Sequence, residues 1–72
     1  MNWIDWAELR RQGEYVRYDL VEGDGNYSIQ ERKGHPDAWS APAVHDFGND
    51  LSVAQDEMTR FLRQRQSEGW TL

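Results

Sequence analysis

The segment Glu22-Gly23-Asp24-Gly25-Asn26-Tyr27 places three oxygen-bearing side chains at alternate positions, which is a pattern that could bind a cation. A calcium loop of the EF-hand type needs oxygens at its first, third and fifth positions, glycine at the sixth and glutamate at the twelfth. Counted from Glu22, the sixth position is Tyr27 and the twelfth is Lys33. Both residues are wrong for calcium, so the segment is predicted to be a turn.

Two histidines stand next to carboxylates: His35 precedes Asp37 by two positions, and His45 is adjacent to Asp46. Two imidazoles and two carboxylates are a ligand set that zinc and related ions accept. The spacing matches no recurrent metal motif, and isolated surface histidines are the commoner outcome. We therefore predict no metal and no other cofactor.

The arrangements typical of enzymes are missing from the sequence. Its serines lack a nucleophile elbow or an adjacent base, and Gly23 and Gly25 precede a predicted strand, where a phosphate loop would precede a helix. A chain of 72 residues also has difficulty enclosing a pocket of useful volume. We expect no catalytic residues and no enzymatic activity.

Negative charge is concentrated in the middle of the chain. The net charge is −5, and residues 18–59 hold nine acidic residues but only two basic ones. This surplus repels phosphate backbones and attracts basic surfaces, so direct nucleic-acid binding is not expected as the main activity. Solubility is the alternative explanation of the same surplus.

The chain has no cysteine, no apolar segment of membrane-spanning length and no signal-peptide core, which predicts a cytoplasmic protein that does not bind membranes.

Two helices and three strands are predicted to position these groups in a single domain, residues 1–72. Asn2 fits an N-cap, Trp6 and Leu9 share one side at helical spacing, and Gly13 is a typical stop, which predicts a first helix over residues 3–12.

Alternating apolar and polar residues over 15–20 and 27–31 predict two strands, joined by a hairpin turn at Asp24-Gly25. The favoured register sets Leu20 opposite Ile29, because a slip of one residue would oppose like charges.

A third strand is predicted over residues 39–47, at a sheet edge or bulged, because Pro42 cannot donate to a ladder. Asp50 is the predicted N-cap of a long second helix that ends at Gly69. Trp70 then packs on the helix end or adds a short edge strand.

These elements predict an α+β two-layer sandwich, with a three-stranded antiparallel sheet in α-β-β-β-α order and both helices on one face. The predicted core residues are Trp6, Leu9, Val16, Tyr18, Leu20, Ile29, Met58, Phe61 and Leu62.

Two segments resemble HicB-type antitoxins. YVRYDLVEGDGNYSI, residues 15–29, is similar to their opening strand and acidic turn, and FGNDLSVAQDEM, residues 47–58, is similar to the start of their helix. The segment Pro36-Asp37-Ala38-Trp39 comes later than its counterpart in the family and lacks that counterpart's glycine, and the family's DNA-binding appendage is absent. The resemblance implies a partial double-stranded-RNA-binding-like fold whose acidic surface binds a basic, nucleic-acid-acting protein. A short, acidic, cysteine-free chain is also similar to phage-encoded anti-CRISPR inhibitors, which occupy positively charged nucleic-acid channels.

We therefore predict an inhibitory protein–protein interaction module that occupies the basic nucleic-acid-binding surface of a nuclease, CRISPR effector or toxin. An aromatic anchor is expected at Trp39 or Tyr15. The alternative is a structural or assembly subunit of a phage or mobile element, which self-associates through the edge near Pro42 and through Trp70. The predicted partner-binding residues are Glu22, Asp24, Asp37, Trp39, Asp46, Asp50, Asp56 and Glu57.

Overall fold

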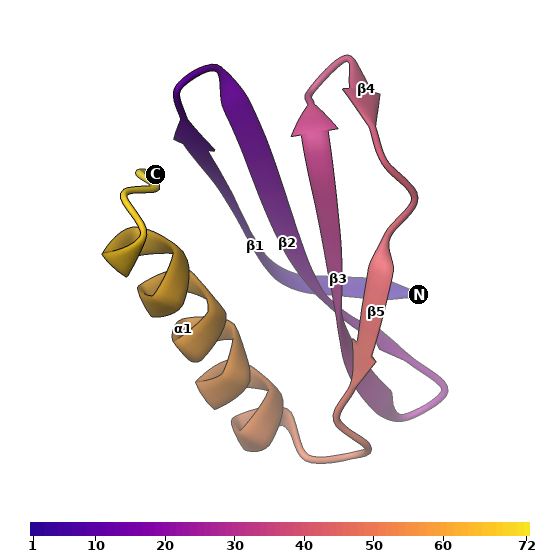
Figure 1. Ribbon diagram of the computed structural model, residues 1–72. Helices are drawn as coiled ribbons and strands as arrows, with labels where there is room; N and C mark the ends of the chain where they lie inside the picture. The colour runs from indigo at the N-terminus through magenta and orange to yellow at the C-terminus, as the bar shows by residue number, and fades with distance from the viewer.

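The computed structural model describes residues 1–72 as an antiparallel sheet followed by one helix (Figure 1). Strands β1, β2 and β3 are neighbours in that order, and the short strands β4 and β5 both pair with the outer side of β3. The α+β class is confirmed, whereas the three-stranded sheet and the α-β-β-β-α order are wrong. The elements are β1 (Asn2–Arg11), β2 (Glu14–Gly23), β3 (Asn26–His35), β4 (Ala38–Trp39), β5 (Ala43–Asp46) and α1 (Leu51–Ser67).

Strand β1 replaces the helix predicted over residues 3–12. Trp6 and Leu9 fit a helical stripe, but in the strand Leu9 faces the core opposite Val16 while Trp6 is 58% exposed. Gly13 follows Gln12 in a two-residue hairpin turn, with φ of 79° and 52°, and does not end a helix. The prediction failed because pairing with β2 satisfies the backbone of the whole segment, which outweighs the helical spacing of a few apolar residues.

The central hairpin of β2 and β3 is confirmed in its turn and in its register. Asp24 and Gly25 have φ of 54° and 78°, as a tight primed turn requires. Leu20 lies opposite Ile29, and Arg17 lies opposite Arg32.

Asp19 relieves the repulsion of the two opposed arginines. Its carboxylate is 2% exposed and accepts hydrogen bonds from Arg17 Nε and Nη2 at 3.0–3.1 Å and from Arg32 Nη1 at 3.3 Å. Asp19→Asn removes the negative charge without changing the shape, so we expect a loss of about 1.5 kcal/mol in the free energy of unfolding. Urea denaturation measures this loss. Asp24→Asn, at an exposed position without an ion pair, is the control and should unfold at the wild-type midpoint.

The remaining elements begin and end close to the predicted proline break, N-cap and helix end. The predicted third strand is divided into β4 and β5 around Pro42, and both pieces lie at the sheet edge. Asp50 caps α1 by accepting hydrogen bonds from the backbone N–H groups of Ser52 and Val53. After the helix, Thr71 forms a single antiparallel bridge with Arg10, so the predicted C-terminal edge strand is reduced to one pair. The protein has no helix with the length and apolar character that crossing a membrane requires.

The core lies between one face of the sheet and α1. Trp6 is the only predicted core residue that is exposed, because its strand directs it to the opposite face. Phe61 and Leu62 are half-buried against the core. The buried core cluster consists of Leu9, Val16, Tyr18, Leu20, Ile29, Ala54, Met58 and Trp70.

Candidate protein interface

Four of the predicted carboxylates lie at one end of the molecule, which we call the acidic tip: Glu22, Asp24, Asp46 and Asp50. Two segments meet there, the β2–β3 turn and the loop between β5 and α1 (Figure 1). Backbone hydrogen bonds join the segments, because the N–H of Tyr27 donates to the carbonyl of Gly48 at 2.7 Å and the N–H of Phe47 donates to that of Tyr27 at 2.9 Å. The four carboxylates are therefore held on a connected backbone frame.

The other predicted interface residues lie elsewhere. Asp56 and Glu57 are on the first half of α1, where Glu57 pairs with Arg60 at 3.3 Å. Asp37 and Trp39 lie at the far end of β3, in the β3–β4 turn and in β4. The acidic set is thus divided into a tip, a helix pair and one distant carboxylate, and the expected anchor Trp39 is not beside the tip.

The acidic tip gathers four carboxylates that have no basic partner, whereas the other acids without an ion pair lie on three different elements: Asp5 on β1, Glu14 at the start of β2 and Asp56 on α1. Carboxylates of the sheet and of the helix end form ion pairs with arginines at N–O distances of 3.0–3.9 Å: Glu8, Asp19, Glu31 and Glu68. None of the four tip carboxylates forms an ion pair with lysine, arginine or histidine. Their field therefore extends into solvent and is not cancelled locally.

Asp50 is held ionised by its capping role. Hydrogen bonds from Ser52 and then from Val53 lower the pKa of the Asp50 carboxyl below its usual value. Asp50 consequently contributes to the charge of the tip while it stabilises the start of α1. Glu22 has a local role as well, because it accepts hydrogen bonds from the Asn2 side chain and from the N–H of Gly25.

The face of the sheet away from α1, which we call the open face, carries exposed aromatic residues that the sequence prediction missed. Trp3 is 65% exposed and Trp6 is 58% exposed. Trp3 lies opposite Val21 and Trp6 lies opposite Asp19, and directly opposed residues share a face, so both tryptophans stand on the open face. Two tryptophans within four residues were a usable signal, but the helix prediction assigned Trp6 to the core. From the tip outward, the rows across the open face are Trp3–Val21–Ser28–Asp46, Trp6–Asp19–Gln30–Val44, Glu8–Arg17–Arg32 and Arg10–Tyr15–Gly34–Trp39.

A hydrogen-bonded network lies between the sheet and α1. Tyr18 donates its hydroxyl to Glu31 Oε2 at 2.6 Å, and Arg65 donates to both Tyr18 and Glu31 at 2.9 and 3.2 Å. Burial, together with the bond to Glu31, raises the pKa of Tyr18 to about 12. Burial also favours a higher pKa for Glu31, but the bonds from Tyr18 and Arg65 outweigh it and lower the pKa of Glu31 below its usual value. At neutral pH the tyrosine stays protonated and the glutamate stays ionised, so the network holds the helix on the sheet.

The two histidines lie in different places. His35 Nδ1 is 3.6 Å from Asp37, on the exposed β3–β4 turn, whereas His45 Nε2 is 3.8 Å from Glu31, beside the helix. The protein has no group of three or more histidine, cysteine or carboxylate side chains that could hold a metal ion.

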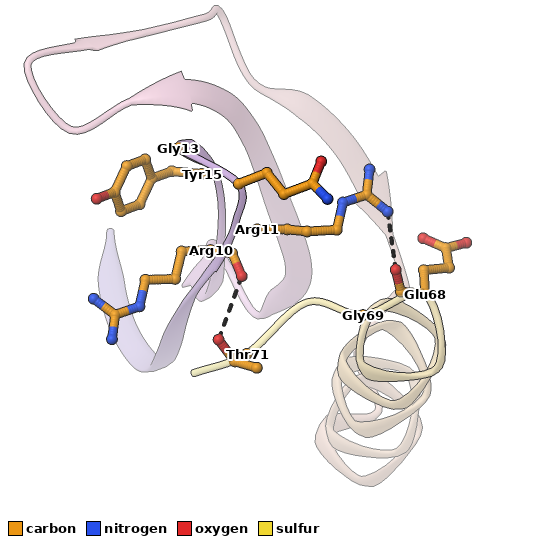
Figure 2. Close-up of a pocket in the computed structure, with 8 residues that line it drawn as sticks. Arg10, Arg11, Gly13, Tyr15, Glu68, Gly69 and Thr71 are labelled. Carbon is orange, nitrogen blue, oxygen red and sulfur yellow. Dashed lines mark hydrogen bonds between the residues drawn. The ribbon is translucent and has the colours of Figure 1, made fainter.

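The largest cleft, about 600 Å³ in volume, lies at the end of the sheet opposite the acidic tip, between the β1–β2 turn and the end of α1 (Figure 2). Arg10 and Arg11 both line it, but Figure 2 shows that their side chains leave the strand in opposite directions. The Arg11 guanidinium donates to the Glu68 carbonyl oxygen at 2.9 Å. The two arginines therefore do not point at a common position where they could both bind one anion.

No family model, curated protein or solved structure matches the chain. A functional assignment therefore depends on the surfaces of this protein alone. The acidic tip and the open face are the two that carry unusual features.

Proposed function

We propose that the protein is an interaction module whose acidic tip binds the basic nucleic-acid-binding surface of another protein and thereby inhibits it. The observation that carries this proposal is the gathering of four carboxylates without ion pairs at one end of the molecule, in contrast to Glu8, Asp19, Glu31 and Glu68, which pair with arginines. Carboxylates without an internal partner gain most from a cationic target, because no existing ion pair has to be broken. The role is binding without catalysis, and the expected targets are nucleases, CRISPR effectors or toxins.

Inhibition would follow from competition with nucleic acid. A groove that binds a phosphate backbone presents lysines and arginines, and a rigid array of carboxylates can occupy the same positive potential. Hydrogen bonds of Tyr27 to the loop before α1 fix that array before binding, which reduces the ordering entropy that association would otherwise cost. Attraction between opposite charges would also accelerate encounter, and salt would weaken it.

The test compares two double variants that each remove two negative charges, none of which forms an ion pair with lysine or arginine. E22Q/D24N neutralises half of the tip, whereas E14Q/D37N neutralises two acids outside it. Asp50 is left unchanged because it caps the helix. Immobilised protein is exposed to host lysate, and the bound proteins are quantified by mass spectrometry at low and at high salt. We expect wild type and E14Q/D37N to retain the same basic, nucleic-acid-binding protein, and E22Q/D24N to bind it about tenfold more weakly, ~1.4 kcal/mol.

Two further measurements decide the mechanism. Added DNA should displace the retained protein, and purified wild type should inhibit the nucleic-acid-dependent activity of that protein. Retention that is insensitive to salt, or that falls equally in both variants, would contradict the proposal.

A further inference from the structure

The open face contains four exposed apolar residues, which we call the tryptophan patch: Met1, Trp3, Trp6 and Val44. Trp6 and Val44 stand at the two ends of one cross-strand row. The Met1 sulfur lies 4.0 Å from the side-chain nitrogen of Gln30 in the same row, so Met1 reaches across the sheet between them. Their exposed fractions are 74% for Met1, 65% for Trp3, 58% for Trp6 and 54% for Val44.

Charges beside the tryptophan patch are paired within one copy. Asp19 is 2% exposed and pairs with Arg17 and Arg32 at 3.0 and 3.3 Å, and Arg17 also lies 3.9 Å from Glu8. The middle of the open face therefore presents little net charge to a second copy. A two-fold axis parallel to the strands would set each row against the same row of that copy, without placing unpaired like charges against each other.

We infer that two copies of this chain associate through their open faces, with the tryptophan patches at the centre of a symmetric dimer. In this arrangement Trp6 of one copy lies opposite Val44 of the second copy, so the two patches cover each other. The Arg17 guanidinium lies 4.6 Å from the centre of the Trp6 ring within one copy, which holds that ring in place before association. The product is two sheets packed face to face with a helix on each outer side.

The area of the patch is sufficient for a small dimer. Tryptophan buries about 200 Å² when it is fully covered, so two half-exposed tryptophans with Met1 and Val44 offer on the order of 400 Å² of apolar surface per copy. With the polar rows around it, the interface would reach about 1,200 Å² in total, at the lower limit for a specific complex. The monomer itself buries only 10 of its 72 residues, and oligomerisation is a common means of stabilising so thin a core.

Association through the outer edge of β1 is disfavoured, which favours the open face over that edge. The backbone N–H of Trp6 donates to the carboxylate of Asp5 at 2.8 Å, and the register shifts between Trp3 and Asp5. A bulge and a side chain that occupies a backbone donor both oppose the addition of another strand. Of the two features that the sequence predicted for self-association, Trp70 is only 6% exposed, and the edge near Pro42 is divided into the short strands β4 and β5.

Sedimentation velocity over a concentration series tests this inference on the purified protein. Wild type is expected to dimerise with a Kd on the order of 10 µM. W3T/W6T removes both tryptophans while it keeps residues that favour strands, and it should remain monomeric. V53S/L72S removes two other exposed apolar residues, 43% and 69% exposed, and should dimerise like wild type. Circular dichroism confirms that each variant is folded.

Small-angle scattering separates the face-to-face dimer from an end-to-end one. The monomer is 37 Å long, and a face-to-face dimer keeps nearly that maximum dimension, whereas joining tip to cleft would approximately double it. A wild type that stays monomeric, a W3T/W6T variant that still dimerises, or an end-to-end envelope would each overturn the inference. E22Q/D24N should dimerise normally, so failure of the dimer and failure of the proposed tip function are separate results.

Discussion

Trp70→Ala is expected to leave a large fraction of the protein unfolded at 25 °C. Trp70 is 6% exposed and belongs to the same core cluster as Leu9 and Met58. Truncating a buried tryptophan costs about 3–5 kcal/mol, and a domain of this size is stable by only about 5 kcal/mol. Urea denaturation followed by circular dichroism should show an incomplete native baseline.

The position of Trp70 explains why the loss is not local. The guanidinium carbons of Arg11 and Arg65 lie 4.7 and 5.5 Å from the centre of its ring, and two backbone hydrogen bonds pin Thr71 to Arg10 at 2.8 and 3.0 Å. Removing the ring uncovers the core at the helix end and frees the tail that closes it.

Two variants make the Trp70 result specific. The indole nitrogen of Trp70 is buried without a hydrogen-bond partner, so Trp70→Phe removes no bond and should cost only about 1–2 kcal/mol. Leu72→Ala, in the same tail at a 69% exposed position, should change the stability by less than about 0.5 kcal/mol. A wild-type unfolding midpoint for Trp70→Ala would contradict the assigned role.

Local turn and cap chemistry made the central hairpin and the C-terminal helix predictable. Asp24-Gly25 tolerates positive φ at both positions, and charge opposition at the wrong register left one pairing. Asp50 offered an acceptor directly before an apolar stripe, and it is the observed N-cap. In each case the decisive interaction lies within a few residues or within one hairpin, which is the range that a sequence reports directly.

The N-terminal strand was not predictable on the same grounds. Over residues 3–12 a period of 3.6 and a period of 2 place Leu9 on an apolar side equally well, and only the β2 edge decides between them. The error then propagated, because Trp6 was assigned to a core that it does not enter.

The acidic tip was half predictable. The acidic residues of the tip could be identified from their charge, but their proximity depends on backbone hydrogen bonds between Tyr27 and the loop at 47–48. Asp37 is separated from the tip by the length of β3, which runs from Asn26 to His35.

The network of Tyr18, Glu31 and Arg65 predicts a stability profile with an acidic limb and an alkaline limb. Burial alone would raise the folded-state pKa of Glu31, but the hydrogen bonds from Tyr18 and Arg65 outweigh burial and lower this pKa. The stabilisation that Glu31 contributes is therefore fully present above the ordinary glutamate value. It is lost as the pH falls through the folded-state pKa. The folded-state pKa of Tyr18 is raised from 10.0 to about 12, chiefly by burial, so its contribution is lost as the pH rises through that interval.

Glu31→Gln should therefore destabilise the protein by about 2 kcal/mol at pH 7, because Arg65 and Tyr18 lose a charged acceptor whose side chain is only 14% exposed. The difference from wild type should disappear at acidic pH, where the wild-type carboxylate is protonated as well. Glu57→Gln is the matched control. Its partner Arg60 is 75% exposed, and such a surface pair contributes little, so the pH profile should match that of wild type.

Tyr18→Phe tests the alkaline limb in the same experiment. This variant keeps the ring that stacks on Phe61 at 5.4 Å but has no proton to lose between pH 10 and 12. Its stability should be lower than that of wild type at neutral pH and should fall less steeply above pH 10. The free energy of unfolding, measured by urea titration from acid to alkali, gives both limbs. An acidic limb as steep in Glu31→Gln as in wild type, or an alkaline limb as steep in Tyr18→Phe as in wild type, would assign the pH dependence to other groups and remove the network from the account of stability.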